Sequence, residues 1–386
     1  MSGTPPIPIY QGQDFYVPYF EVKLQGQGRP LGQDIVRDIS QVTYKDNLED
    51  VDNFELTIVN WDAETRTYKY SDGDLFDPGK RLELWMGYYG KDGLRLMITG
   101  EINSLRPSFP SSGQPTMVIS GLNLLHTLRK KQESHTYERL KDGQIARQIA
   151  DRLKIALHTD REAEAKEERF PYLFQDNKYD IVFLMERARR IGYDLFVEEI
   201  AAKGQASQPR LYFGPSVNVR AVTYRLVNGS SLGEFNPELT TAKQVSKVTV
   251  RGWDSVNKKA IEASATRGEL KTKGVGARGG EPAIDHSFDQ REEIIANRPI
   301  HSKPEAKTLA LQTLERISKD MVKGTGSVVG LPDLRAGSVV MIEGLGTRFS
   351  GRYFVTSTTH TIGDGGYTTQ FECRREELSD SAGPAR

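Results

Sequence analysis

Apolar and polar residues alternate through positions 15–125 and predict a run of short strands with one polar face. In NFELTIVNW, Phe54, Leu56 and Ile58 share one face of the expected strand, and Glu55 and Thr57 lie on the other. KRLELWMGYYG (80–90) repeats this alternation, and RLMITGEINSL and TMVISGLNLL follow it after Gly and Pro clusters. Regular short strands with one polar face are typical of a barrel or a sandwich.

Near residue 140 the apolar spacing changes from that of a strand to that of a helix. KDGQIARQIADRLKI carries apolar residues at helical spacing, with Asp142 as its expected cap. REAEAKEERF (161–170) is mostly charged and is expected to be a solvated connection or helix face. A second helix, expected to begin at Asp180 and end at Gly192, precedes the strand YDLFVEE. These features predict a small α/β segment.

From about residue 209 the strand pattern returns, interrupted by an expected long loop at 265–300 that is rich in Gly and Lys. SKPEAKTLALQTLERISKDMVKG then predicts a helix over 302–323. Ser302 and Glu305 fit a capping box there, Pro304 lies in the tolerant first turn, and Gly324 is expected to end the helix. Its apolar face holds Ala306, Leu309, Ala310, Leu314, Ile317 and Met321.

Two stretches, 76–121 and 334–373, share one pattern of turns and strands. Each has a Gly at a turn, an apolar strand, a second Gly, a strand, a Gly turn and a final strand. The matched glycines are Gly79 and Gly337, Gly100 and Gly351, and Gly113 and Gly365. The match is in pattern rather than identity, so chance similarity is the alternative to duplication.

The predicted fold class is therefore mainly β with an α+β insertion: two similar β-barrels and a small α/β domain. The expected boundaries are 1–125 for the first barrel, 126–208 for the α/β domain and 209–378 for the second barrel. Residues 379–386 are expected to form a polar tail.

Composition removes several functional classes. Lys plus Arg and Asp plus Glu both number 52, so the chain lacks the basic excess expected of a nucleic-acid or anionic-membrane binder. No apolar run approaches the ~20 residues of a membrane span, and MSGTPPIPIY has no secretory pattern. One cysteine excludes an intrachain disulfide and a cysteine-based zinc site.

The candidate for chemistry is Cys373 with His360, in the hydroxyl-rich stretch FSGRYFVTSTTHTIGDGGYTTQFECRR. If IGDGGY turns a hairpin, Cys373 faces Thr356 and His360 faces Thr369. The pair is then offset by roughly 13 Å at the rise of a strand, beyond hydrogen-bond reach. We therefore expect a strand hairpin and no catalytic residue.

The remaining polar motifs do not specify a reaction. The other histidines lack metal-ligand spacing and are expected on the surface or in loops: His126, His135, His158, His286 and His301. GVGARGG (274–280) resembles a phosphate loop only by its glycines. The acidic pairs Glu198–Glu199 and Glu292–Glu293 are two among many carboxylates. We expect no catalytic, metal or cofactor site.

The order of the segments resembles the phage late-control D family of tail baseplate hub proteins. It is similar also to the N-terminal region of the type VI secretion VgrG spike. The resemblance spans about residues 15–376 and depends on VTVRGWD, on LMERARRIGYDLFV, and on the closing AG…FSGRYFV…H…GGYTTQF.

The resemblance implies a homotrimer whose two tail-tube-like barrels per subunit form a pseudo-hexameric ring. Such a ring is a non-enzymatic symmetry adapter between the hexameric inner tube of a contractile tail and a trimeric spike. VgrG-type chains continue into an OB-fold and a needle; since this sequence ends in a short polar tail, a separate spike protein is expected. Other baseplate proteins are expected partners, without nucleic-acid binding or membrane insertion.

The resemblance also implies assembly in the bacterial cytoplasm into a phage tail, an R-type bacteriocin or an extracellular contractile injection system. Two alternatives remain open at the level of sequence. One is a cell-wall hydrolase that travels with the particle, and the other is a receptor- or glycan-binding β protein.

Overall fold

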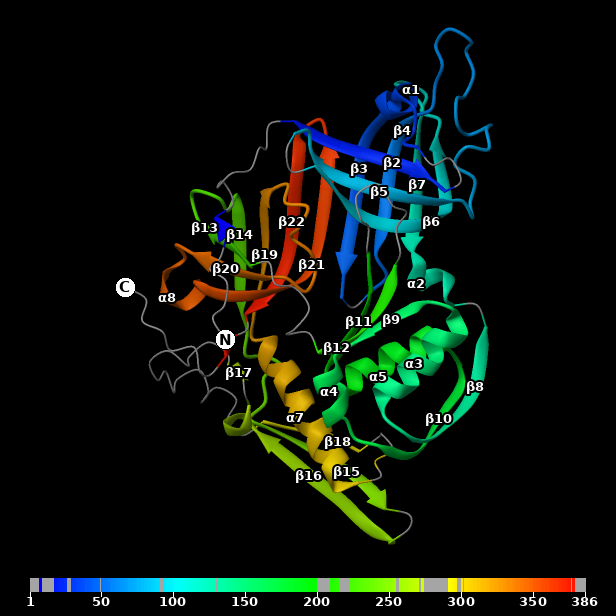
Figure 1. Cartoon of the computed structure of the whole chain (residues 1–386). Coiled ribbons are helices and arrows are strands. Elements are labelled where there is room, and N and C mark those ends of the chain that lie inside the picture. Colours follow the sequence, from blue (N-terminus) through cyan, green and yellow to red (C-terminus); the bar gives the residue numbers. More distant parts are fainter. Residues whose placement is uncertain are drawn as a thin grey trace.

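The computed structural model describes most of the chain (Figure 1). The described residues are 7–8, 17–25, 29–48, 50–90, 93–129, 131–199, 209–215, 223–254, 257–270, 272–273, 291–296, 300, 302–375 and 377–378. GVGARGG and the expected polar tail lie outside them. Within the described residues, no helix is long and apolar enough to span a membrane.

The first β unit contains the strands predicted from alternation. It is made of β2 (Pro18–Leu24), β3 (Ile39–Asn47), β4 (Asn53–Val59), β5 (Arg81–Tyr88), β6 (Leu94–Ser108) and β7 (Thr116–Asn123). Helix α1 (Gln33–Asp38) precedes β3. The strands are antiparallel in the order β2-β5-β6-β7-β4-β3. Phe54, Leu56 and Ile58 face the core and are fully buried, as the alternation predicts.

The second β unit repeats this order. Its strands are β13 (Thr223–Val227), β14 (Glu234–Leu239), β19 (Val322–Val329), β20 (Val339–Glu343), β21 (Gly351–Gly363) and β22 (Gly366–Arg375). They lie in the order β13-β20-β21-β22-β19-β14. One orientation differs, because β13 is parallel to β20 whereas β2 is antiparallel to β5. The chain order of the six strands is the same in both units.

The two units also share backbone details. Gly79 and Gly337 have φ of +93° and +86°, which a glycine adopts without strain. Gly79 donates its N–H to Ile102 O, and Gly337 donates its N–H to Val355 O, both at 2.8 Å. A bulge follows Ile102 in β6 and Val355 in β21. The ladders therefore confirm the Gly79–Gly337 match.

The Gly100–Gly351 match is wrong by two residues. Gly100 lies opposite Leu82, and the equivalent position of the second unit, opposite Val340, is held by Tyr353. Strand β5 is longer than β20, and β6 is longer than β21, whose chain enters through the α8 turn (Gly346–Phe349), so glycine spacing alone misaligned the strands.

The α/β segment follows β7. Its elements are α2 (Leu124–Thr127), β8 (Gln132–Leu140), α3 (Asp142–Leu153), β9 (Ala156–Thr159), α4 (Arg161–Lys166), β10 (Phe170–Tyr179), α5 (Asp180–Ile191), β11 (Tyr193–Glu198) and β12 (Arg210–Pro215). Strands β9, β12 and β11 form one sheet, and β8 and β10 form a two-stranded ribbon. Strand β12, which we expected at the start of the second barrel, pairs with β11 and β9 instead.

The two helices predicted in this segment, α3 and α5, form as expected, but their first aspartates do not cap them. Lys141 and Tyr179 are the N-cap residues, and Asp142 and Asp180 are the first helical residues. Each carboxylate binds an arginine instead: Arg187 with Asp142, and Arg152 with Asp180. Gly192 ends α5 with φ of +72°, as expected.

A further segment, the α7 segment, lies between β14 and β19. It consists of β15 (Lys247–Asp254), β16 (Lys259–Thr266), the 3₁₀ turn Arg267–Glu269, β18 (Glu292–Ile295) and α7 (Lys303–Lys319). In the first unit the corresponding connection, from β3 to β4, is only the short turn 48–52. The α7 segment is therefore an insertion into the repeated order, and part of the expected loop at 265–300 is strand β18.

Helix α7 begins as predicted, since Ser302 Oγ accepts the Glu305 N–H at 3.1 Å. It ends at Lys319 rather than near Gly324, because Val322 already starts strand β19. Met321, expected on the helix face, lies past the helix and packs in the second β unit. Glu305 binds Arg190 of α5, which joins the α7 segment to the α/β segment.

Four apolar cores match these four parts of the chain. The two β units form one 13-stranded sheet, joined where β21 pairs with β3 (Figure 1, red beside blue). The short strand β1 (Ile7–Pro8) is one of the thirteen and pairs with β13, whereas β17 (Thr272–Lys273) and β23 (Glu377–Leu378) form a separate two-stranded sheet. Among the described residues, no ladder of hydrogen bonds closes either β unit into a barrel. The two barrels and the domain boundaries therefore stay predictions.

Candidate functional site: the junction between the two β units

The β21–β22 hairpin holds the two β units together. Tyr353 and Cys373, at its base, pack in the core of the second unit. Ile362 and Tyr367, near its turn, pack in the core of the first unit. One hairpin therefore contributes side chains to both cores, and a shift of either unit disturbs the packing of the other.

A buried ion pair lies beneath this hairpin. Arg335, from the loop before β20, donates from Nε to Asp46 Oδ2 of β3 at 2.6 Å. Its Nη2 donates to the Tyr44 hydroxyl and to Met97 O, and its guanidinium lies over the Tyr44 ring at 4.7 Å. Arg335, which belongs to the second unit, thus binds strands β3 and β6 of the first unit. No local pattern could predict this contact, because the partners are about 290 residues apart.

His360 belongs to the same buried cluster and is held neutral. Its Nε2 donates to Leu334 O at 3.0 Å, and its Nδ1 lies within reach of the hydroxyls of Tyr367 and Thr369. Burial and the nearby charge of Arg335 lower the pKa of His360 to about 3. With both ring nitrogens engaged and no exposed surface, His360 has a structural position in the junction.

Cys373 lies at the other end of the hairpin. His360 pairs with Thr369, as the sequence predicts, but a bulge at Thr356 places Cys373 opposite Val355 rather than Thr356. The two candidates remain four residues apart along the hairpin: Cys373 packs in the core of the second unit, whereas His360 lies against the rings of Tyr44 and Tyr367. Burial, with a smaller contribution from Glu372, raises the pKa of the Cys373 thiol well above its usual value. A protonated, buried thiol is a poor nucleophile.

A second carboxyl group stands beside the ion pair. Asp52 is buried, and it accepts hydrogen bonds from Asn47 N at 3.0 Å and Asn123 Nδ2 at 2.9 Å. Burial and the charge of Asp46 raise the pKa of Asp52 to about 7, despite these donors. The two buried carboxyl groups, of Asp46 and Asp52, thus lie near the single guanidinium of Arg335, which binds Asp46 directly. Neither Asp46, Asp52 nor Arg335 was found from the sequence.

The other candidates from the sequence are dispersed. His126 is exposed, His135 pairs with Glu133, and His158 pairs with Glu198, while His286 and His301 lie outside the described residues. Glu199 binds the Thr99 backbone and hydroxyl, and Glu292 binds Thr249 and Lys247. Across the described part of the chain, no three His, Cys, Asp or Glu side chains gather as a metal site.

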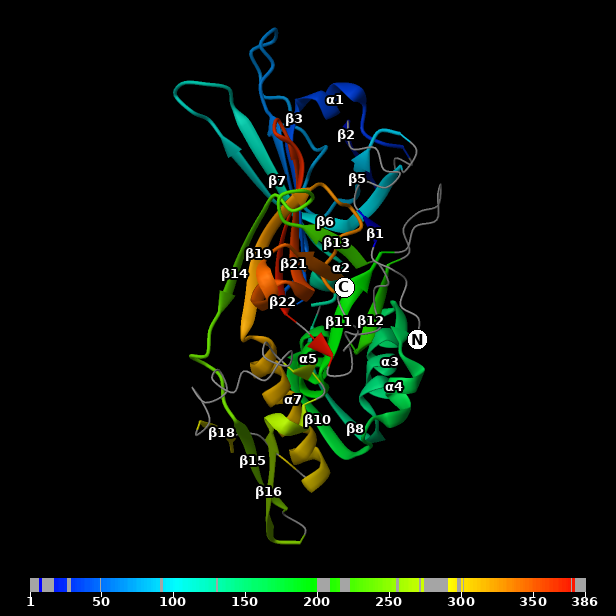
Figure 2. The ribbon, with the colours of Figure 1, turned by 90° about the vertical axis from the view of Figure 1, so that its left-hand side faces the viewer.

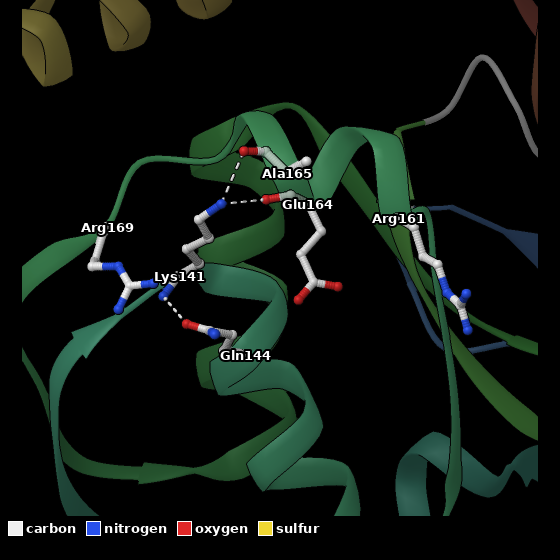
Figure 3. Close-up of a pocket in the computed structure, with 6 residues that line it drawn as sticks. All are labelled: Lys141, Gln144, Arg161, Glu164, Ala165 and Arg169. Atoms are coloured by element: carbon white, nitrogen blue, oxygen red, sulfur yellow. Dashed lines mark hydrogen bonds between the residues drawn. The ribbon is translucent and has the colours of Figure 1, made fainter.

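An open pocket of about 300 Å³ lies between α3 and α4 (Figure 3). Its lining residues are Lys141, Gln144, Arg161, Glu164, Ala165 and Arg169. Lys141 donates to the carbonyls of Glu164 and Ala165 at 3.0 and 2.9 Å, and so closes the end of α4. The ammonium group of Lys141 is therefore bound by backbone carbonyls of the fold itself. The Glu164 carboxylate is in turn bound by Arg147.

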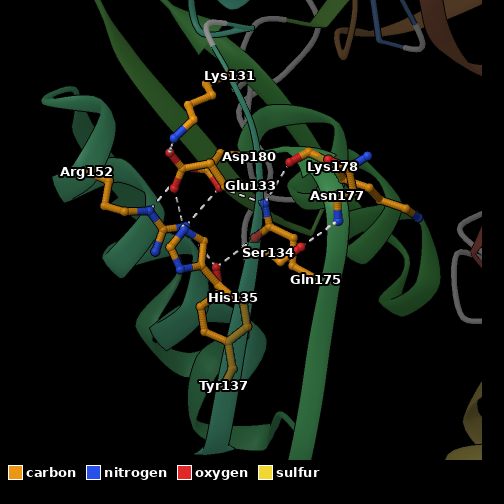
Figure 4. A network of polar contacts seen from close by, with 10 residues as sticks. All are labelled: Lys131, Glu133, Ser134, His135, Tyr137, Arg152, Gln175, Asn177, Lys178 and Asp180. Atoms are coloured by element: carbon orange, nitrogen blue, oxygen red, sulfur yellow. Dashed lines mark hydrogen bonds and ion pairs between the residues drawn. The ribbon is translucent and has the colours of Figure 1, made fainter.

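A polar network fixes the β8–β10 ribbon to the helices (Figure 4). Arg152 of α3 binds Asp180 of α5 through Nε and Nη2, and also donates to the Tyr137 hydroxyl at 2.9 Å. Gln175 accepts from Tyr137 and donates to Asp180. Burial opposes ionisation of Asp180, but Arg152 and Gln175 hold its pKa below the usual value. The network is fully paired and is structural.

Exposed aromatic side chains gather at the free end of the β6–β7 hairpin. Phe109 is 55% exposed and meets Tyr68 edge to face at 4.8 Å, and Tyr68 meets Trp61 at 5.5 Å. Figure 2 shows this hairpin projecting away from the rest of the molecule. Contiguous exposed apolar residues are typical of interaction surfaces.

The profile of one protein family, described as the Alg8 N-terminal domain, matches residues 19–364. This is not the late-control D family suggested by the order of the segments. A comparison with curated proteins found no match.

Several solved structures have the same fold. The 43 kDa tail protein of prophage MuSo2 from Shewanella oneidensis is 15% identical with a TM-score of 0.67, and the match covers 93% of this chain and 100% of that one. A tail protein from Neisseria meningitidis MC58 is 13% identical with a TM-score of 0.65, covering 96% and 100%.

The E. coli c3393 protein is 11% identical with a TM-score of 0.58, and the match covers 95% of this chain and 79% of that one. It is described as a component of the type VI secretion system with structural similarity to the T4 bacteriophage tail proteins gp27 and gp5. At these identities the likeness establishes a shared fold.

Proposed function

Since this chain belongs to the family of the Alg8 N-terminal domain, and its fold is that of phage tail proteins, we propose that it is the baseplate hub of a contractile injection machine. The hub is a homotrimer that joins the sixfold inner tube to a threefold spike. It is a structural component of the particle and acts without catalysis, metal or cofactor.

The observation that carries the proposal is the repeated strand order of the two β units. Three copies of a chain with two similar units present six similar surfaces around a threefold axis. One side of such a ring fits a hexameric tube and the other fits a trimeric spike. The junction supports this role, because the shared hairpin and the Arg335–Asp46 pair keep the two units in one fixed relation.

Two measurements test the proposal. Light scattering coupled to gel filtration is expected to give the mass of a trimer, and electron micrographs of the isolated protein should average to a threefold ring. Co-expression with inner tube and spike proteins should yield a complex that contains all three. A protein that stays monomeric at every concentration and never joins a tube or spike would overturn the proposal.

A further inference from the structure

Within the part of the chain that the structure describes, the pairing of β21 with β3 has no counterpart on the other side of the molecule. In the first unit, the open edge of β3 is covered by β21 of the second unit. In the second unit, the equivalent strand β14 pairs only with β19 among the described residues. The β6–β7 hairpin, equivalent to β21–β22, projects freely (Figure 2).

We propose that the β6–β7 hairpin of one copy lies along β14 of a second copy, and so repeats between chains the contact that β21 makes with β3 within a chain. The inference rests on the proposed ring of copies and deepens it, since it names the surfaces that meet. In a ring the intrachain and interchain contacts would then alternate, and every unit would have a covered edge.

The ladders give the register of this contact. Ile102 and Val355 are equivalent, because each accepts the N–H of the matched glycine and each precedes the bulge. Counting along the strands from this pair makes Ser108 equivalent to Thr361. The ladders that lead from β7 through β4 to β3, and from β22 through β19 to β14, match residue by residue and make Asn236 of β14 equivalent to Thr43 of β3.

Since Thr361 pairs with Thr43, Ser108 of one copy is expected to face Asn236 of the next. The same register places Arg106 opposite Glu238.

Side chains on the two edges are complementary in this register. Leu105 and Phe109 of the hairpin face Leu239 and Phe235 of β14, apolar against apolar. On the other face, Arg106 meets Glu238. Glu238 is exposed, and the side chain of Arg106 stays 60% exposed while it pairs with Glu55, so both can contact a second copy.

Burial of the equivalent residues shows what docking does to such a hairpin. Ile362, at the position equivalent to Phe109, is only 7% exposed because it packs in the neighbouring unit, whereas Phe109 is 55% exposed. The exposed aromatic group at the free hairpin is therefore the surface that a second unit would cover.

Prolines on both edges limit what else can pair there. Pro107 and Pro237 occupy the positions equivalent to His360 and Tyr44, which pair within the chain. A proline supplies no N–H, so the ladder between copies opens at this pair, and side-chain contacts on either side have to stabilise it. Prolines at an open edge also disfavour pairing with unrelated strands.

The test is disulfide formation between copies. A Ser108→Cys, Asn236→Cys variant is compared with a Ser108→Cys, Glu234→Cys control, whose second cysteine lies two residues out of register on the same exposed face. The native Cys373 is 2% exposed and stays out of the reaction. After mild oxidation, the first variant should give reducible covalent dimers and trimers on a denaturing gel, and at least tenfold less should form in the control.

Charge reversal gives a second measurement. Glu238→Arg and Arg106→Glu should each weaken self-association about tenfold, the two combined should restore it, and Glu234→Arg should have no such effect. Two results would overturn this contact and leave the hub role intact. One is equal cross-linking of both cysteine variants, and the other is an absence of cross-linking in a protein that forms a ring and joins a tube. In-register cross-links in a protein that never joins a tube or spike overturn the hub role and keep the contact.

Discussion

The Arg335–Asp46 pair offers the sharpest test of how the two β units are joined. In Arg335→Met, the side chain keeps its approximate volume but loses its charge and its hydrogen bonds to Asp46, Tyr44 and Met97. Asp46 then remains 5% exposed, with the Ala336 N–H at 3.1 Å as a remaining donor. A buried carboxylate without its cation is strongly unfavourable.

Removing one partner of a buried ion pair costs about 3–5 kcal/mol. For a domain of this size the apparent melting temperature should fall on the order of 10 °C. Arg95→Met is the matched control, because Arg95 pairs with Asp333 at 3.1 Å but is 55% exposed. An exposed pair contributes less than about 1 kcal/mol, so the control should melt close to the wild type.

The charge itself is tested by Arg335→Met combined with Asp46→Asn. Because this double variant has no unpaired buried charge, it should be more stable than Arg335→Met alone. Thermal unfolding followed by circular dichroism, supported by urea midpoints, measures both effects. A loss below about 1 kcal/mol for Arg335→Met, or a double variant as unstable as the sum of the single changes, would refute the reasoning.

Further predictions concern the same junction. Burial and the neighbouring carboxylate raise the pKa of Asp52 to about 7, so this carboxyl group contributes stability that is lost as pH rises from about 4 to 7, and in urea titrations Asp52→Asn should lose less stability than the wild type over that rise. Burial and the neighbouring guanidinium lower the pKa of His360 to about 3, so its contribution is lost as pH drops below about 6.5 and opposes that of Asp52 in the wild type; His360→Gln should lose less stability than the wild type toward low pH, and parallel curves for wild type and variant would contradict either assignment. A Cβ on Gly330 would lie 2.0 Å from Cγ of Tyr367, so Gly330→Ala should cost roughly 1–3 kcal/mol, and an unchanged melting temperature would show that the hairpin end is loosely packed. Cys373 should react with a thiol reagent only on unfolding, and rapid modification of the native protein would contradict its burial.

Local signals predicted the elements whose residues interact with near neighbours. Alternation located the strands around Phe54 and Leu82, and the 3.6-residue spacing located α3, α5 and α7. The hairpin register of His360 with Thr369 followed from the turn alone, because strands joined by a tight turn pair outward from it. The bulge at Thr356 has no such local cause, and it moved the partner of Cys373 by one residue.

The errors come from interactions between distant segments. Asp142 and Asp180 have the sequence signature of caps, yet arginines 45 residues farther along and 28 residues back along the chain, respectively, bind them. The stretch 265–300 was expected to be a loop, but it contains strand β18. That strand is stabilised by its pairing with β15 rather than by its own composition. We expected strand β12 at the start of the second β unit, whereas its pairing with β9 and β11 places it in the sheet of the α/β segment.

By itself, the sequence determined that the chain is mainly β with helices at three places, and that a pattern of turns recurs in its two halves. Only the tertiary structure decided that β21 crosses to the first unit, and that Arg335, Asp46, Asp52 and His360 form one buried cluster. The physical reason is that alternation specifies which face of a strand is buried, whereas it carries no information about which strand lies beside it. That choice depends on contacts between residues hundreds of positions apart, and these appear only when the whole chain is folded.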